Sequence, residues 1–74
     1  MDKIWIEEYR CNFWRVAKVF RNGKEIETIN RFFSVDEEWI YIYKTVGGTG
    51  TGFSRGDLIR KIFIGDCEFE HIEI

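Results

Sequence analysis

The stretch at 16–29, VAKVFRNGKEIETI, decides how this chain folds. Within it, Asn22-Gly23 separates two runs that are rich in β-branched and aromatic residues. Asparagine and glycine accept the positive φ angles that a two-residue hairpin turn requires. The stretch therefore predicts antiparallel strands at 15–21 and 24–31, joined by a tight turn.

The segment before this hairpin fits two structures. Between 13 and 20, aromatic and β-branched residues dominate and the turn follows directly, which favours a strand. Apolar residues also recur at steps of three and four, which is helical spacing, and Asp2 stands where a helix cap would. A short helix over about the first twelve residues is therefore a second interpretation. The apolar residues at this spacing are Ile6, Tyr9, Phe13, Val16 and Phe20.

Three further runs predict strands. WIYIYKTV at 39–46 is apolar on both faces, which indicates a strand covered on both sides or partly used for binding. DLIRKIFIGD at 57–66 and CEFEHIEI at 67–74 alternate, and the glutamates of the second are typical of an edge strand. About five strands predict one all-β domain over 1–74, a small antiparallel barrel or bent sheet. Its layout resembles the SH3-like and Sm-like small barrels, without a motif that implies a family's function.

The charge and hydropathy of the chain limit the classes of partner that we expect it to bind. The net charge is −2, with seven basic and five acidic residues in 1–35 but four basic and eight acidic in 36–74. A general nucleic-acid binder normally has a basic excess, so nucleic acid is a less favoured partner. No apolar run is long enough to span a membrane, and the acidic N-terminus predicts a cytoplasmic protein with no membrane contact. Local basic candidates are Arg10, Arg15, Lys18, Arg21 and Lys24.

Side chains for catalysis or metal binding are sparse. The single histidine, His71, lies near the C-terminus, and neither serine has the surroundings of an activated nucleophile. Cys67 and His71 would lie roughly 13 Å apart on a strand, too far to share a zinc ion. Cys67 and Cys11 are expected to be reduced, small buried apolar residues. We therefore expect no enzyme, no metal and no cofactor.

The stretch GGTGTGFSRGD at 47–57 is the candidate ligand site. Bare backbone N–H groups can approach an anion closely, and arginine matches a phosphate with two hydrogen bonds. The stretch matches neither the P-loop nor the dinucleotide-binding pattern, and a flexible connection between strands is the competing interpretation. The predicted ligand-binding residues are Gly48, Thr49, Gly50, Thr51, Ser54 and Arg55, with Trp39 or Tyr41 stacking on a base.

These features predict a non-enzymatic binding protein for a phosphate-containing, nucleotide-type ligand. We expect a homo-oligomer, because a subunit boundary supplies the concavity that a small barrel lacks. Small phage proteins that counter host defence by sequestering signalling nucleotides resemble this chain, in size, acidity and single-domain make-up only. The alternative is a protein–protein interaction module or inhibitor that docks an acidic, aromatic surface onto a host enzyme.

Overall fold

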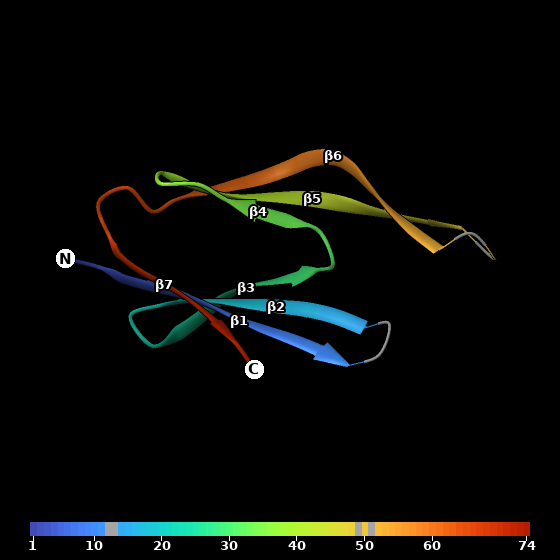
Figure 1. Ribbon diagram of the computed structural model, residues 1–74. Coiled ribbons are helices and arrows are strands. Elements are labelled where there is room, and N and C mark those ends of the chain that lie inside the picture. Colours follow the sequence, from blue (N-terminus) through green and yellow to red (C-terminus); the bar gives the residue numbers. More distant parts are fainter. Residues whose placement is uncertain (12–13, 49, 51) are drawn as a thin grey trace.

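Seven strands form two sheets that stack as layers in the computed structural model, which describes residues 1–11, 14–48, 50 and 52–74 (Figure 1). The first sheet has the order β3-β2-β1-β7, and the second has the order β4-β5-β6. The first sheet comprises β1 (Lys3–Cys11), β2 (Trp14–Arg21), β3 (Lys24–Asn30) and β7 (Glu68–Glu73). The second comprises β4 (Phe33–Val35), β5 (Trp39–Gly48) and β6 (Gly52–Phe63).

The all-β class is confirmed, but the barrel and the N-terminal helix are not. Seven strands are described where five were expected, and the two sheets do not close on each other. The parallel pairing of β1 with β7 also departs from a wholly antiparallel sheet. Residues 3–11 form β1 because β2 and β7 pair with it on both sides, which outweighs its helical spacing. No helix long and apolar enough to cross a bilayer is found in the described ranges.

The predicted hairpin around Asn22-Gly23 is confirmed. Both residues have positive φ angles, 50° and 88°, and Arg21 pairs with Lys24 across the turn. The turn is also tied to the start of β1. The backbone N–H of Asn22 donates to the Lys3 carbonyl at 2.8 Å, and the Lys3 N–H donates to the Asn22 side-chain oxygen at 2.9 Å. Local turn chemistry and a contact with β1 thus stabilise the same corner.

The core between the two sheets is aliphatic. Each buried isoleucine contributes about 1.5–3 kcal/mol relative to an exposed side chain. On β5, Ile40 and Ile42 face the core, while Trp39, Tyr41 and Tyr43 are half-buried on the opposite face. The core residues are Ile4, Ile6, Ala17, Val19, Ile29, Ile40, Ile42 and Ile64.

The two cysteines differ in their surroundings. Cys67 packs against the core as expected. Cys11 is exposed at the end of β1, so its expected burial is wrong. Cys11 is exposed because β1 continues past Glu8, the last buried residue of its inner face.

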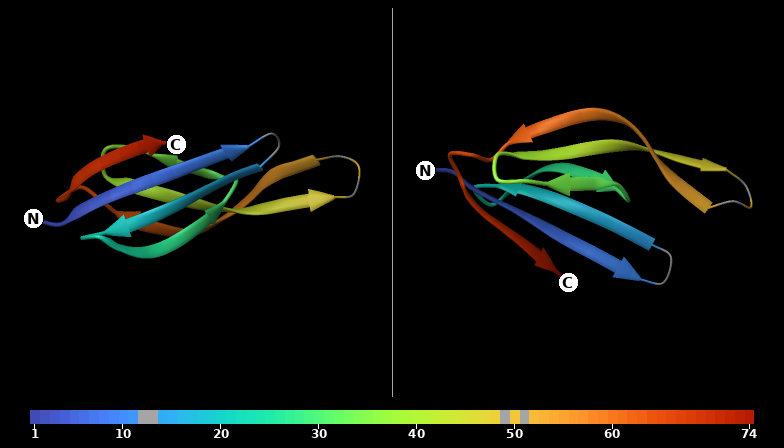
Figure 2. Two further views of the ribbon diagram at one scale, coloured as in Figure 1. Left: turned by 90° about the horizontal axis from the view of Figure 1, so that it is seen from below. Right: turned by 45° about the horizontal axis from the view of Figure 1, so that its top comes forward.

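The end of β5 and the start of β6 extend from the body as a two-stranded arm (Figure 2). We use the name arm for the paired residues 45–48 and 52–55. Most of the predicted glycine loop at 47–57 is therefore strand, with Gly47 paired to Phe53 and Gly48 to Gly52. A Cβ atom on Gly47 would lie 2.4 Å from the Phe53 ring, so the ring fills the space that glycine leaves. Two register shifts between Ile42 and Thr45 bend the arm.

Candidate functional site

The predicted aromatic residues lie far from the predicted phosphate-binding residues. Trp39 begins β5 and Gly48 ends it, which separates them by about 30 Å along an extended strand. Trp39 and Tyr41 line a hollow of about 390 Å³ together with Asp36, Glu37 and Glu38. The structure therefore does not bring the two halves of the predicted ligand site together.

The charge of this hollow disfavours a phosphate. Hydrogen bonds from the Tyr41 hydroxyl at 2.7 Å and from the backbone N–H groups of Glu38 and Trp39 lower the pKa of Asp36, so its carboxylate stays charged. The Lys61 ammonium lies 4.4 Å from the centre of the Trp39 ring and already covers it. The hollow thus combines acidic groups with a ring that contacts a cation.

The remaining predicted residues lie on the arm. Gly48 and Gly50 are near its tip, where Gly50 has a positive φ of 87°, and the Ser54 hydroxyl is 3.4 Å from the Val46 carbonyl oxygen. Thr49 and Thr51 lie outside the described residues. The Arg55 guanidinium lies 4.5 Å from the centre of the Tyr43 ring. Arg55 is the predicted phosphate-binding residue whose charged group contacts an aromatic ring, and Tyr43 was not among the predicted ligand-binding residues.

Two further arginines lie over aromatic rings. The Arg15 guanidinium lies 4.6 Å from the centre of the Phe33 ring, and the Arg31 guanidinium lies 3.7 Å from the centre of the Phe53 ring. Such contacts attract the cation to the ring face and orient the plane of its hydrogen-bond donors. We call Arg10, Arg15, Arg31 and Arg55 the arginine surface.

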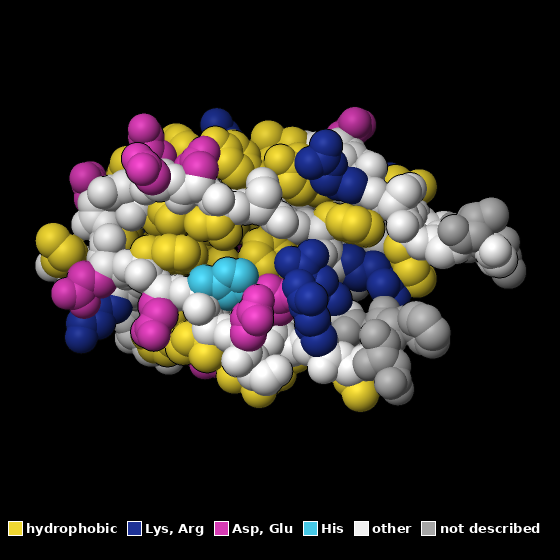
Figure 3. Space-filling view, viewed as in Figure 1, with side chains coloured by type: hydrophobic (Ala, Val, Ile, Leu, Met, Phe, Trp, Pro, Cys, Tyr) yellow, Lys and Arg dark blue, Asp and Glu magenta, His cyan; other side chains and the backbone are white. Residues whose placement is uncertain are grey.

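Contacts link neighbouring members of the arginine surface. Arg15 donates from Nη1 to the Arg31 carbonyl at 2.8 Å, and Arg31, with a positive φ of 69°, carries its side chain to Phe53 on the arm. Phe53 and Arg55 are two residues apart in a regular part of β6, so they share a face about 6.6 Å apart. Figure 3 shows Lys and Arg side chains gathered on this face, beside the histidine and below the arm.

Two hydrogen bonds hold the arm against the body at this corner. The Thr45 hydroxyl donates to the Asn30 carbonyl at 2.5 Å, and the Tyr43 N–H donates to the Phe32 carbonyl at 3.1 Å. The first connects β5 to the last residue of β3, and the second connects β5 to the segment between β3 and β4. The corner that carries Arg31 is thereby fixed relative to the strand that carries Tyr43.

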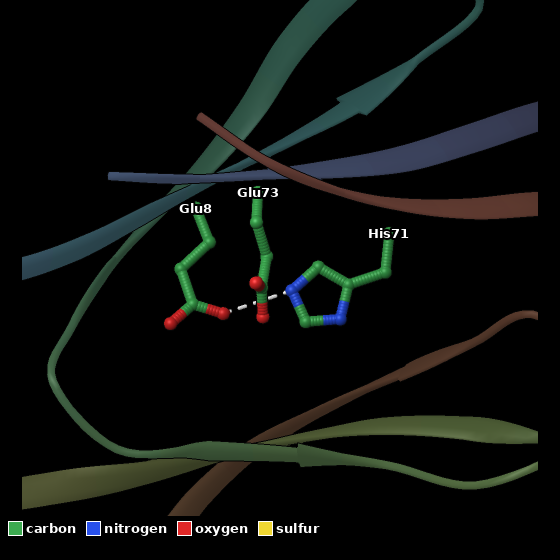
Figure 4. A group of neighbouring side chains, drawn as sticks. All are labelled: Glu8, His71 and Glu73. Carbon is green, nitrogen blue, oxygen red and sulfur yellow. Dashed lines mark hydrogen bonds and ion pairs between the residues drawn. The ribbon is translucent and has the colours of Figure 1, made fainter. Parts of the chain in front are cut away.

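A buried carboxylate anchors one end of the arginine surface. Glu8 is 1% exposed, and its Oε2 accepts hydrogen bonds from the Nε atoms of Arg10 and Arg15, both at 2.7 Å. Its Oε1 lies 2.9 Å from His71 Nε2 (Figure 4). Burial raises the pKa of Glu8, but the hydrogen bonds from Arg15, Arg10 and His71 outweigh it and hold this pKa at about 2. The buried group is therefore a charged carboxylate at neutral pH.

The same cluster has the donor types of a zinc site. Glu8, His71 and Glu73 each offer one ligand atom, and these atoms lie within 4.8 Å of one another (Figure 4). However, Arg10 and Arg15 balance the two carboxylates, so a dication would meet no net negative charge. The arrangement fits an ion-pair network better than a metal centre. Glu8 follows Ile4 and Ile6 at inward positions of β1, and this inward acidic residue was the signal that sequence reasoning missed.

Acid should destabilise the protein through Glu8. Its pKa is about 2 when folded, against an ordinary 4.5, so its contribution is complete above about pH 4.5 and is lost as pH falls through 2. A shift of this size corresponds to about 3 kcal/mol. Urea unfolding at pH 7, 4.5 and 2.5 would measure the loss. The variant Glu8→Gln should show a smaller loss over this range, and an unchanged pH dependence in that variant would contradict the assignment.

No family model, no curated protein and no solved structure matches this chain.

Proposed function

We propose that this chain is a non-enzymatic binding protein that holds the phosphates of a nucleotide-type ligand on the arginine surface. The observation that carries the proposal is that the guanidinium groups of Arg15, Arg31 and Arg55 each lie over an aromatic ring, 3.7 to 4.6 Å from its centre. The donors of a guanidinium lie in one plane and contact with a ring restricts the orientation of that plane, which suits bidentate contact with a phosphate. The outer plane of the guanidinium can also stack on a base.

The local charge supports an anionic ligand although the whole chain is acidic. The arginine surface contributes four positive charges, and the adjacent Glu8 and Glu73 contribute two negative charges. The acidic run at 36–38 lies at the start of β5, away from the arm. Of the ligand-binding residues predicted from the sequence, the proposed site therefore includes Arg55 but not Trp39 or Tyr41.

A protein-interaction module is the second candidate. It is favoured by four exposed apolar side chains on β6, an edge strand of its sheet: Phe53, Leu58, Ile59 and Phe63 are 54%, 47%, 61% and 39% exposed. Exposed apolar groups on a sheet edge suit docking against another chain, including a second copy. The register shifts along β6 weigh against simple strand addition, because bulges disrupt a regular ladder.

Thermal shift would test the nucleotide proposal with ATP, GTP and pyrophosphate as probes. A probe at 100 times its Kd should stabilise the protein by about 2.7 kcal/mol, a clear rise in Tm for a domain of this size. Arg55→Ala should weaken binding at least tenfold, while its own stability changes by no more than about 0.5 kcal/mol because the residue is exposed.

The matched control is Arg21→Ala, which removes an exposed arginine from β2 whose only described ion pair is with Asp2 at 3.9 Å. This variant should bind the probes like the unmodified protein. Equal losses in both variants would indicate non-specific charge attraction. If no concentration of any of the three probes raises the Tm, the nucleotide proposal is wrong and the protein-interaction module remains the candidate function.

A further inference from the structure

The arginine surface faces solvent: Arg10 and Arg55 are exposed, and Arg15 and Arg31 are half-buried. Three hollows of about 270, 350 and 390 Å³ lie between β3 and the β5–β6 pair, between β1 and β7, and at the start of β5, and Tyr43, the ring partner of Arg55, lines the first of them. None of these three is lined by a member of the arginine surface. Small molecules are normally bound in concave sites that cover most of their surface. An open surface fits a longer ligand that makes several separate contacts.

The four members of the arginine surface come from successive elements of the fold. Arg10 and Arg15 share Glu8 at the end of β1 and the start of β2, Arg31 occupies the corner after β3, and Arg55 lies on the arm. A mononucleotide presents its phosphates at one end only. A chain of nucleotides presents a phosphate at every step, so it can contact successive arginines along the row.

The aromatic rings under the guanidinium groups add a second kind of contact. They come from three different strands: Phe33 from β4, Tyr43 from β5 and Phe53 from β6. Arginine planes and aromatic rings stack on bases that are unpaired, whereas bases inside a duplex are already stacked on each other. We infer that the ligand class of this surface is a single-stranded nucleic acid several nucleotides long; this rests on the proposed function.

The charges at the arginine surface predict that the association constant for a single strand depends only modestly on salt. For single strands, the logarithm of the association constant falls by about 0.7 per phosphate contact for each tenfold rise in salt. With a local excess of two positive charges, we expect two or three phosphate contacts. Raising salt from 50 to 200 mM should then weaken binding by about 7- to 20-fold.

Fluorescence anisotropy with a labelled ten-nucleotide oligothymidylate would test the inference. We expect thymidine monophosphate to compete at least 100-fold more weakly than the unlabelled oligonucleotide. Arg10→Ala and Arg55→Ala should each weaken oligonucleotide binding at least fivefold and reduce the salt slope by about 0.7. Arg21→Ala is the control and should change neither quantity. Circular dichroism melting would confirm that each variant is folded.

Each other outcome overturns a different statement. Equal competition by thymidine monophosphate would keep the proposed function and overturn the single-strand inference. Equal competition by a polyglutamate of similar length would overturn the nucleic-acid class in favour of an acidic protein segment. Absence of binding to the oligonucleotide and to every nucleotide probe would overturn both proposals.

Discussion

Replacing Glu8 with alanine should lower the free energy of unfolding by about 3–5 kcal/mol. The side chain is 1% exposed and accepts hydrogen bonds from Arg10 and Arg15. Its removal leaves Arg15, whose side chain is 31% exposed, without its carboxylate in a partly buried place. A loss of this size is a large fraction of the 5–15 kcal/mol that stabilises a typical domain. Urea unfolding at neutral pH, followed by tryptophan fluorescence, would measure it.

Glu7→Ala provides the matched control for this prediction. Glu7 is the neighbouring residue on the opposite face of β1, where it accepts hydrogen bonds from Tyr9 at 2.6 Å and Trp5 at 3.0 Å. These bonds lower the pKa of Glu7, but its side chain is half-buried, so we expect a clearly smaller loss than in Glu8→Ala. Similar losses in the two variants would show that the ion-pair network does not stabilise the fold. Glu8→Gln gives the comparison if Glu8→Ala does not fold.

Ile40→Ala should be the most damaging core substitution on the second sheet, costing about 2–5 kcal/mol. Ile40 is 0% exposed and lies on β5, the central strand of that sheet, where it packs against residues of the first sheet. A small domain buries little surface for its size, so one such cavity can bring it close to unfolding. Chemical denaturation would provide the measurement.

The control for this substitution is Ile59→Ala on β6. Ile59 is 61% exposed, so the same chemical change should cost no more than about 0.5 kcal/mol. If both variants lose the same stability, the two sheets do not pack through Ile40 as described. If Ile59→Ala alone is destabilised, the exposed side chain is covered in solution, which would favour the protein-interaction module.

The parts of the fold that were predicted correctly depend on local chemistry. Asn22-Gly23 favours a tight turn because both residues accept positive φ angles, and this preference acts within the turn itself. The strand at 39–46 and the edge strand near the C-terminus followed from β-branched and alternating residues in the same way. The N-terminal segment was ambiguous because its spacing fits a helix, and the pairing partners that make it a strand come from β2 and β7.

The candidate site was predicted only in part, for a similar reason. Arg55 could be identified as an anion-binding side chain from its chemistry and its glycine-rich surroundings. Its ring partner Tyr43 lies across the arm, and Arg31 reaches Phe53 from another part of the chain. The glycines predicted a backbone open to an anion, but the sequence did not indicate that the Phe53 ring fills the space over Gly47.

The sequence by itself determined the all-β class and the central hairpin, because turn preference and side-chain alternation act between residues that are close along the chain. Only the tertiary structure decided that Glu8 is a buried charge shared by Arg10 and Arg15, and that Arg31 and Arg55 lie over aromatic rings of other strands. Both depend on which strands become neighbours, and β7 meets β1 across more than sixty residues of chain, as in the Glu8–His71 contact at a separation of 63. A carboxylate is tolerated inside only where such distant partners supply hydrogen bonds that exceed the cost of its burial.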